Sequence, residues 1–455
     1  MILVQSLRQL LSGNKLLVYL FSICMVFASC STTKEVSRSN SRTTTSRPAK
    51  KKQRTKTRPT KVDTVQWKTE SGKRADDDLI SSTGYMLKES YSLSLFIPFN
   101  ATRAEATDIS DKTNKYNAYL NFYGGAKMAL NELEDEGYNL SIEVRDSESS
   151  SFKQNLRNAV KENDVIVGPY DLDDIKFAAR EAKKTETLLI SPWKATSKIK
   201  DNPYYLQLIP SLYDHFDKMV EHSTANYDLS NIFIVGRKGV SKDKNIIRYF
   251  QESHIEKNGE DAKLLNEIYV ELDSLINAED VFGKHLVENE QNVFLFPNYS
   301  NKDEAYLRDV LRRLNVDKGI NSVISYVMPM AYNSEIINYD FYNSLRMRVV
   351  RSYYVDPTDR SVQQFKRDFF DIYGATPTED AYKAYDMMHF IAKSLKKYGK
   401  EFQFHVNRET EGYLQTSFDI DAKYSEVRSD VPSVQYFMNN HLDVLKFKNN
   451  RFHRK

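Results

Sequence analysis

The stretch Asp164-Val-Ile-Val-Gly-Pro169 joins three adjacent apolar residues to a Gly-Pro turn. A short apolar run bounded by turn residues predicts a buried strand. Amphipathic stretches on either side, 152–163 and 173–184, predict helices, and beyond them lie two further apolar runs, 140–144 and 188–191. Strands that alternate with helical crossovers at this spacing indicate a parallel sheet.

The same alternation extends in both directions along the chain. Upstream, residues 91–98 predict a strand, and residues 117–136 predict a helix that Gly137 closes. Further strands, with helices between them, are predicted at 231–236, 292–297 and 322–327. The fold class is therefore α/β of the doubly wound parallel type. With more than 300 residues in this pattern, two sheets are expected rather than one.

Six segments, taken in order, resemble type I periplasmic binding proteins, the fold of branched-chain amino-acid receptors and of ligand-binding regions of some membrane receptors. The segments are Tyr123-Gly-Gly-Ala-Lys-Met-Ala-Leu130, the turn at Asp146, Asp164–Pro169, Leu189-Ile-Ser-Pro192, Ser352-Tyr-Tyr-Val-Asp356 and Ala384-Tyr-Asp386. They span about residues 90–400. The segment 412–420 also resembles the closing part of binding-protein-like lipoproteins of the Bacteroidetes type.

The resemblance implies two lobes that the chain joins by three crossovers. It places lobe 1 at about 89–210 and 356–403, and lobe 2 at about 211–349 and 412–455. The crossovers are expected near Ile209–Leu212, Val349–Val355 and Phe404–Tyr413. A ligand is then expected in the cleft outside the carboxyl ends of the strands, with lobe closure about the crossovers as the functional motion.

The candidate ligand contacts of lobe 1 follow two of its strands. They are Tyr170, Asp171, Ser191, Trp193, Thr196 and Ser197. In amino-acid receptors of this family the corresponding loops offer hydroxyl and N–H groups to a carboxylate. This sequence has Tyr170-Asp171 where a Ser or Thr is expected, and an Asp there would repel a carboxylate. Asp171 is favoured as a helix N-cap over a ligand contact. Trp193 either stacks on a ligand ring or packs in the fold.

In lobe 2 the candidate contacts are Arg237, Asn298 and Tyr299, which follow two predicted strands. Arg237 either binds an anion or covers the surface. No nucleophile elbow, HExxH motif, P-loop or dinucleotide fingerprint is present, and the eight His residues show no ligand spacing. We therefore expect a protein that is not an enzyme, with no metal and no cofactor.

The N-terminus carries the order of a secretory signal. Arg8 and Lys15 precede an apolar run of about 12 residues that ends in Phe27-Ala28-Ser29-Cys30. This order resembles a bacterial lipoprotein signal, which implies cleavage after residue 29 and acylation of Cys30 with fatty acids such as palmitate. An ordinary cleaved signal with a stray cysteine is the alternative. The residue after Cys30 is Ser31 and not the Asp that favours inner-membrane retention, so the periplasmic face of the outer membrane is expected in a diderm.

Residues 30–88 form a basic linker rich in Ser and Thr, with eleven Lys and Arg against one acid between 31 and 61. Such a composition predicts a disordered tether, either an adhesive for anionic surfaces or a solvated spacer. Residues 89–455 hold 48 Lys and Arg against 56 Asp and Glu. An acidic globular part argues against nucleic acid as a partner.

Two functions fit these features. The first is an envelope-anchored solute-binding lipoprotein that captures a small polar ligand between two lobes and serves a permease, as ABC-transporter substrate-binding proteins do. The second is a non-transport interaction protein at the outer membrane, such as a regulator of peptidoglycan synthesis that contacts a cell-wall synthase.

Overall fold

The computed structural model describes residues 63–66, 79–80, 86–100, 115–277, 280–409, 413–425 and 433–454. The predicted signal peptide, Cys30 and most of the linker lie outside these ranges. Among the described helices, none combines the length and apolar character needed to cross a bilayer.

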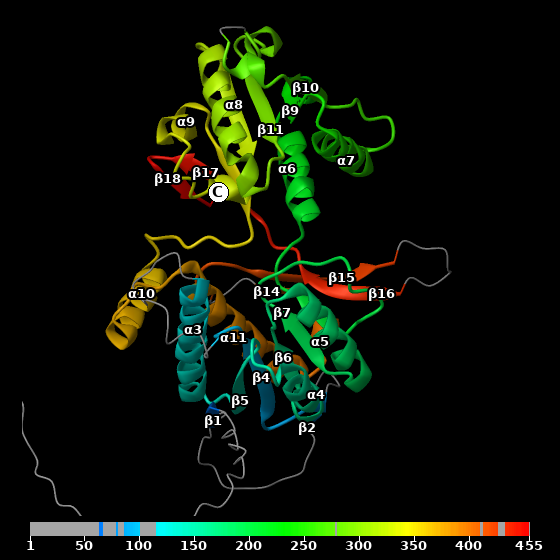
Figure 1. Cartoon of the computed structure of the whole chain (residues 1–455), viewed down its shortest axis with the longest axis vertical. Coiled ribbons are helices and arrows are strands. Elements are labelled where there is room, and N and C mark those ends of the chain that lie inside the picture. Colours follow the sequence, from blue (N-terminus) through cyan, green and yellow to red (C-terminus); the bar gives the residue numbers. More distant parts are fainter. Residues whose placement is uncertain are drawn as a thin grey trace, which may run out of the picture. The chain divides into compact units, whose positions relative to one another are not determined.

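The first lobe is built on a nine-stranded sheet with the order β1-β5-β4-β6-β7-β8-β16-β15-β14 (Figure 1). The six central strands of this order, from β5 to β16, are parallel to one another. Antiparallel pairs are added by β1 at one edge and by β15 and β14 at the other. The bounds are β1 Asp63–Gln66, β4 Tyr91–Ile97, β5 Leu140–Asp146, β6 Val165–Val167, β7 Leu188–Ser191, β8 Tyr205–Gln207, β14 Arg408–Glu409, β15 Phe418–Tyr424 and β16 Val434–Asn439. A separate hairpin pairs β2 (Leu79–Ile80) with β3 (Met86–Leu87).

The second lobe is built on a seven-stranded sheet with the order β10-β9-β11-β12-β13-β17-β18. The first five strands pair in parallel, and the last two pairs are antiparallel. The bounds are β9 Ile232–Arg237, β10 Asn266–Val270, β11 Gln291–Phe296, β12 Ser322–Val327, β13 Arg348–Arg351, β17 Asp443–Lys448 and β18 Arg451–His453.

Helices cover both faces of each sheet. Those of the first lobe are α3 Lys115–Asp135, α4 Phe152–Glu162, α5 Leu172–Thr185, α10 Arg360–Tyr373 and α11 Glu379–Tyr398. Those of the second lobe are α6 Leu212–Asn226, α7 Ser241–Asn258, α8 Glu304–Asp317 and α9 Tyr339–Ser344. The two-lobed, doubly wound α/β fold predicted from the sequence is thus confirmed.

The alternation of side chains along each strand explains these layers. In β4, Leu93 and Leu95 pack with α3 and α11 on one face, whereas Phe96 packs with α4 and α5 on the other. In β11, Phe294 packs with α8, whereas Leu295 packs with α6 and α7. Because both faces are buried, these strands are apolar throughout, as parallel strands usually are.

The third crossover was predicted in the wrong place. The chain passes between the sheets at 208–211 and at 352–359, which agrees with the first expectation and overlaps the second, but its third passage is at 440–442. Strands β14, β15 and β16 all belong to the first sheet, so of the segment 412–455 that was expected in lobe 2 only 443–454 lies there. The β15–β16 hairpin extends the first sheet because β16 pairs with β8, a tertiary choice that strand patterns do not encode.

Candidate functional site

The loop after β6 begins with Gly168 at φ 87, a left-handed conformation that favours glycine. A Cβ at this position would also lie 2.3 Å from the Phe96 carbonyl oxygen of the neighbouring strand. Gly168 therefore lets the chain turn closely over β4 and deliver Tyr170 to the carboxyl end of the sheet, as the Gly-Pro pattern indicated.

Tyr170 belongs to an aromatic cluster that the two strand-end loops build with α3. Its ring centroid lies 5.4 Å from that of Tyr119 and 6.0 Å from that of Trp193. Trp193 also lies against Phe122, with centroids 4.5 Å apart. The Lys194 ammonium sits 4.1 Å above the Tyr170 ring, a cation–π contact. Of the two alternatives for Trp193, packing is thus observed, and ring stacking on a ligand stays open.

The N-terminus of α5 carries negative charge. The Asp171 carboxylate accepts a hydrogen bond from the Asp173 N–H at 2.8 Å, so the predicted N-cap role of Asp171 is confirmed. Asp173 and Asp174 occupy the first turn. The Lys176 ammonium holds the pKa of Asp173 below its usual value, whereas burial and the nearby Asp171 raise the pKa of Asp174. Three carboxylates at this helix end disfavour an anionic ligand there.

The hydroxyl candidates of the second loop fold that loop on itself. The Ser191 hydroxyl donates to the Lys194 carbonyl oxygen at 3.0 Å, and Ser191 is almost fully buried. The Thr196 hydroxyl accepts from the Lys198 N–H at 3.2 Å. Ser197 is exposed. Of the three, only Ser197 makes no such local bond in the described chain, so a carboxylate cradle of the amino-acid-receptor kind is not assembled here.

Arg237 in the second lobe is held by internal ion pairs. Its guanidinium donates to both oxygens of Asp243 at 2.7 Å and to Asp303 at 2.9 Å, and it lies over the Tyr306 ring at 4.9 Å. The hydrogen bonds that Arg237 donates to Asp243 raise the pKa of Arg237 further above its usual value. Because two carboxylates pair with this cation, we interpret Arg237 as a structural residue rather than as an anion-binding one.

We expect Arg237→Met to destabilise the second lobe by roughly 3 kcal/mol, because it leaves the buried Asp243 carboxylate without its cationic partner. Urea denaturation followed by circular dichroism measures this loss. Arg248→Met is the matched control, since Arg248 forms only an exposed pair with Glu252 and its removal should cost less than about 0.5 kcal/mol. Equal effects of the two variants would contradict the structural role of Arg237.

Asn298 and Tyr299 follow β11. Tyr299 is partly exposed, and the Lys242 ammonium lies 4.1 Å above its ring. The side-chain oxygen of buried Asn298 has no hydrogen-bond partner in the described chain, and neither has the Trp193 indole N–H of the first lobe. Buried polar groups are normally satisfied. An acceptor and a donor therefore remain with unused hydrogen-bonding capacity beside the strand ends of the two lobes.

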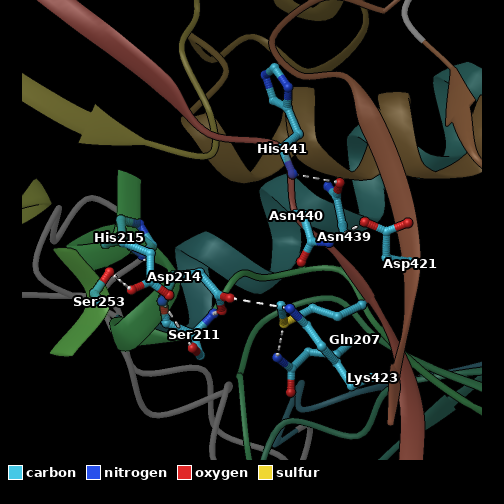
Figure 2. A network of polar contacts seen from close by, with 12 residues as sticks. Gln207, Ser211, Asp214, His215, Ser253, Asp421, Lys423, Asn439, Asn440 and His441 are labelled. Carbon is cyan, nitrogen blue, oxygen red and sulfur yellow. Dashed lines mark hydrogen bonds and ion pairs between the residues drawn. The ribbon is translucent and has the colours of Figure 1, made fainter. Parts of the chain in front are cut away.

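The crossovers form a second polar constellation, which the sequence patterns missed (Figure 2). Gln207 and Asn439 are completely buried at the ends of β8 and β16. The Gln207 amide donates to the Ile209 carbonyl oxygen at 2.9 Å, and the Asn439 side-chain oxygen accepts from the N–H groups of Asp419 at 2.8 Å and His441 at 3.1 Å. Each residue is an amide that directly follows apolar residues at the end of its strand, and this sequence feature could have marked both as candidate site residues.

The same constellation ties the lobes together by charge. Ser211 and Asp214 form a capping box at the start of α6, and the Lys423 ammonium of β15 lies 3.4 Å from the Asp214 carboxylate. His215 hydrogen-bonds the Ser211 carbonyl oxygen through Nδ1 at 2.8 Å, and burial lowers its pKa. Figure 2 shows these side chains converging on the first and third crossovers.

The second crossover is held by a further interlobe pair. Arg351, at the end of β13, pairs with Glu379 at the start of α11 at 2.7 Å. The Tyr353 hydroxyl donates to the Leu208 carbonyl oxygen of the first crossover at 3.3 Å. The Arg351–Glu379 and Lys423–Asp214 ion pairs thus link the two lobes beside the crossovers, and the Tyr353–Leu208 hydrogen bond links the second crossover to the first.

Comparison with known proteins places this architecture in a class. No protein-family model matches the sequence, and no curated protein matches it. Solved structures do match. A protein from Rhodospirillum rubrum described as a branched-chain amino acid ABC transporter has a TM-score of 0.55 at 13% identity, over 80% of this chain and 99% of that one.

Two structures of Haemophilus influenzae LpoA match as well. One has a TM-score of 0.53 at 11% identity, over 81% of this chain and 59% of that one. The other, the C-domain of LpoA, a regulator of PBP1A, has a TM-score of 0.51 at 11% identity, over 80% of this chain and 99% of that one. Identities this low establish the fold alone. The chain has the two-lobed fold of type I periplasmic binding proteins, as the sequence resemblance predicted.

Proposed function

We propose that this protein is a binding protein of the cell envelope that captures a small, polar, non-anionic ligand between its two lobes. The observation that carries the proposal is the charge at the strand ends. Asp171, Asp173 and Asp174 surround the helix end where a ligand carboxylate would bind, and Arg237 is neutralised by its own ion pairs. The aromatic rings of Tyr170 and Trp193 favour a ligand with a ring, such as a sugar or a nucleoside.

Anchoring through Cys30, a placement on the periplasmic side of the outer membrane and a tether formed by residues 31–88 belong to the same proposal. They rest on the sequence order of a charged segment, an apolar run and Phe27-Ala28-Ser29-Cys30. Mass spectrometry of the mature N-terminus tests the anchor: a diacylglyceryl cysteine supports it, and an unmodified Cys30 overturns it.

A second candidate function is an interaction protein that uses this fold without transport, such as a regulator of peptidoglycan synthesis. The absence of a carboxylate cradle among the described strand-end loops favours it, and the fold likeness to LpoA, a regulator of PBP1A, is compatible with it. No catalytic step is required by either function.

Thermal unfolding of the purified protein with amino acids, nucleosides, sugars and muropeptides separates the candidates. Capture predicts that an uncharged ring-bearing solute stabilises the protein, by about 2.7 kcal/mol at a hundred times its dissociation constant, whereas leucine and glutamate do not. Stabilisation by amino acids overturns the non-anionic assignment. No response to any solute, together with co-purification of a cell-wall synthase, supports the second candidate instead.

Trp193 links this screen to the site. We expect Trp193→Ala to weaken binding of the stabilising solute at least tenfold, since it removes both the ring surface and the unpartnered indole N–H. Trp193→Phe keeps a ring and isolates the contribution of the N–H. Tyr339→Ala, which removes an exposed aromatic ring from α9, is the control. Unchanged affinity in Trp193→Ala would exclude this loop from the ligand site.

A further inference from the structure

A small pocket lies on the first lobe between α5 and the segment 198–202. Its volume is about 210 Å³. The uncharged part of its wall comes from Ala179, Ile199 and Asn202. All its remaining lining residues are cations: Lys176, Arg180, Lys183, Lys198 and Lys200. This concentration of positive charge stands on a globular part whose overall balance is acidic.

Local structure brings these cations together. Lys176, Arg180 and Lys183 follow the i, i+4, i+7 spacing that places side chains on one face of a helix. In the facing segment, Ile199 is buried while Lys198 and Lys200 are exposed on either side of it.

Asn202 fixes the facing segment to the helix. It is almost fully buried, and its side-chain amide donates to the Ala179 carbonyl oxygen at 2.9 Å. Its own N–H donates to the Gln435 carbonyl oxygen of β16 at 2.9 Å. The facing segment is therefore fixed to α5 and to β16 by the hydrogen bonds of Asn202.

The charges of the pocket are only partly compensated. Lys176 pairs with Asp173 at 2.7 Å. Lys183, Lys198 and Lys200 form no ion pair with any residue in the described part of the chain.

Two more charged groups of the pocket region, one cation and one acid, make other contacts. Arg180 lies over the Phe177 ring at 5.9 Å. Asp201, the acid within the facing segment, instead accepts a hydrogen bond from the Gln435 amide at 2.7 Å. Like charges that line one pocket repel one another, and an anion bound among them would reduce that repulsion.

We propose that this pocket binds a phosphate group, carried by a soluble phosphate ester or by a phosphate-bearing lipid headgroup. A phosphate monoester brings close to two negative charges and three acceptor oxygens, which suits several ammonium and guanidinium donors arranged around one point. A volume of about 210 Å³ is below the 300–1,000 Å³ typical of sites that enclose a whole small molecule, so the pocket takes the charged group alone. This site is independent of the ligand proposed between the lobes.

Calorimetric titration of the full-length protein with glycerol 3-phosphate tests the site. The pocket variant combines Lys183→Gln, Lys198→Gln and Lys200→Gln, and the control combines Lys257→Gln, Lys284→Gln and Lys366→Gln, three exposed lysines elsewhere. Both variants lose the same charge and keep the basic residues 31–61. We expect the pocket variant to bind at least tenfold more weakly than wild type and the control to stay within twofold of it. An equal loss in both variants, or no binding by wild type, overturns the proposal.

Sedimentation with vesicles that contain phosphatidic acid, whose headgroup is a phosphate monoester, distinguishes the two sources of phosphate. A headgroup ligand predicts that the pocket variant binds vesicles more weakly than the control variant does. A soluble ester predicts equal vesicle binding of the two variants alongside the loss of glycerol 3-phosphate binding. Unchanged behaviour of the pocket variant in both assays contradicts the site.

Discussion

Replacing Gly125 by alanine is expected to destabilise the first lobe strongly. Gly125 lies in α3 where this helix crosses α11, and a Cβ there would lie 1.9 Å from the Ala381 carbonyl oxygen. Backbone atoms on two packed helices would have to separate, which costs roughly 3 kcal/mol or more. This exceeds the gain of up to about 1 kcal/mol that Gly→Ala gives inside a helix. Urea denaturation of the variant measures the difference.

Gly124→Ala is the matched control for that experiment. Its Cβ would meet the Phe369 ring at 3.1 Å and the Tyr373 ring at 3.3 Å, and both are side chains that can shift. The gain in helix propensity is expected to offset most of this contact, leaving a change within about 1 kcal/mol. If Gly125→Ala proved as mild as Gly124→Ala, the close crossing of α3 and α11 would not be a determinant of stability.

Removing the Asp386 carboxylate is the second change with a large expected effect. Asp386 is completely buried in α11, and its two oxygens accept the N–H groups of Leu414 at 2.6 Å, Gln415 at 2.9 Å and Thr416 at 3.2 Å. Asp386→Ala leaves three buried donors unpaired, so we expect a loss of roughly 3–5 kcal/mol in the free energy of unfolding. Asp371→Ala, an exposed acid on α10, should cost less than about 0.5 kcal/mol.

The role of Asp386 reaches the hinge through the segment that it holds. The Gln415 carbonyl oxygen accepts the Tyr354 N–H at 2.9 Å, and the Thr416 hydroxyl donates to the Ser352 carbonyl oxygen at 2.7 Å. Ser352 and Tyr354 belong to the second crossover. Asp386 therefore anchors the second crossover to α11 through the intervening segment 414–416.

The pH dependence of stability provides a specific signature of Asp386. Burial raises the pKa of this carboxyl to about 7, above the value near 3.9 of an unfolded chain. Because the folded form then holds its proton more tightly, the contribution is complete below pH 4 and is lost as the pH rises through 7. Denaturation curves at several pH values should show a fall of up to about 1.4 kcal/mol per pH unit in this window, relative to Asp386→Asn. Parallel curves for the two proteins would contradict a raised pKa.

The candidate site shows how far patterns of residue type can lead. Asp171 was correctly favoured as a helix cap, because a cap depends on neighbours along the chain. Arg237 could not be assigned from the sequence, because Asp303 lies 66 positions away and reaches it only in the folded lobe. Trp193 meets Phe122 and Tyr119 of α3 in the same way, through a contact that no local pattern encodes.

Local periodicity in the sequence by itself determined seven strands of the two parallel sheets, the helices predicted beside them and the fold class. Each of these follows from interactions within a few residues and from the burial of one or two faces. Only the tertiary structure decided that the β15–β16 hairpin joins the first sheet, that the third crossover lies at 440–442, and that Arg237 is neutralised. It also brought Lys183 opposite Lys198 and Lys200. These outcomes depend on pairings between distant residues, whose free energies arise only when the lobes are packed.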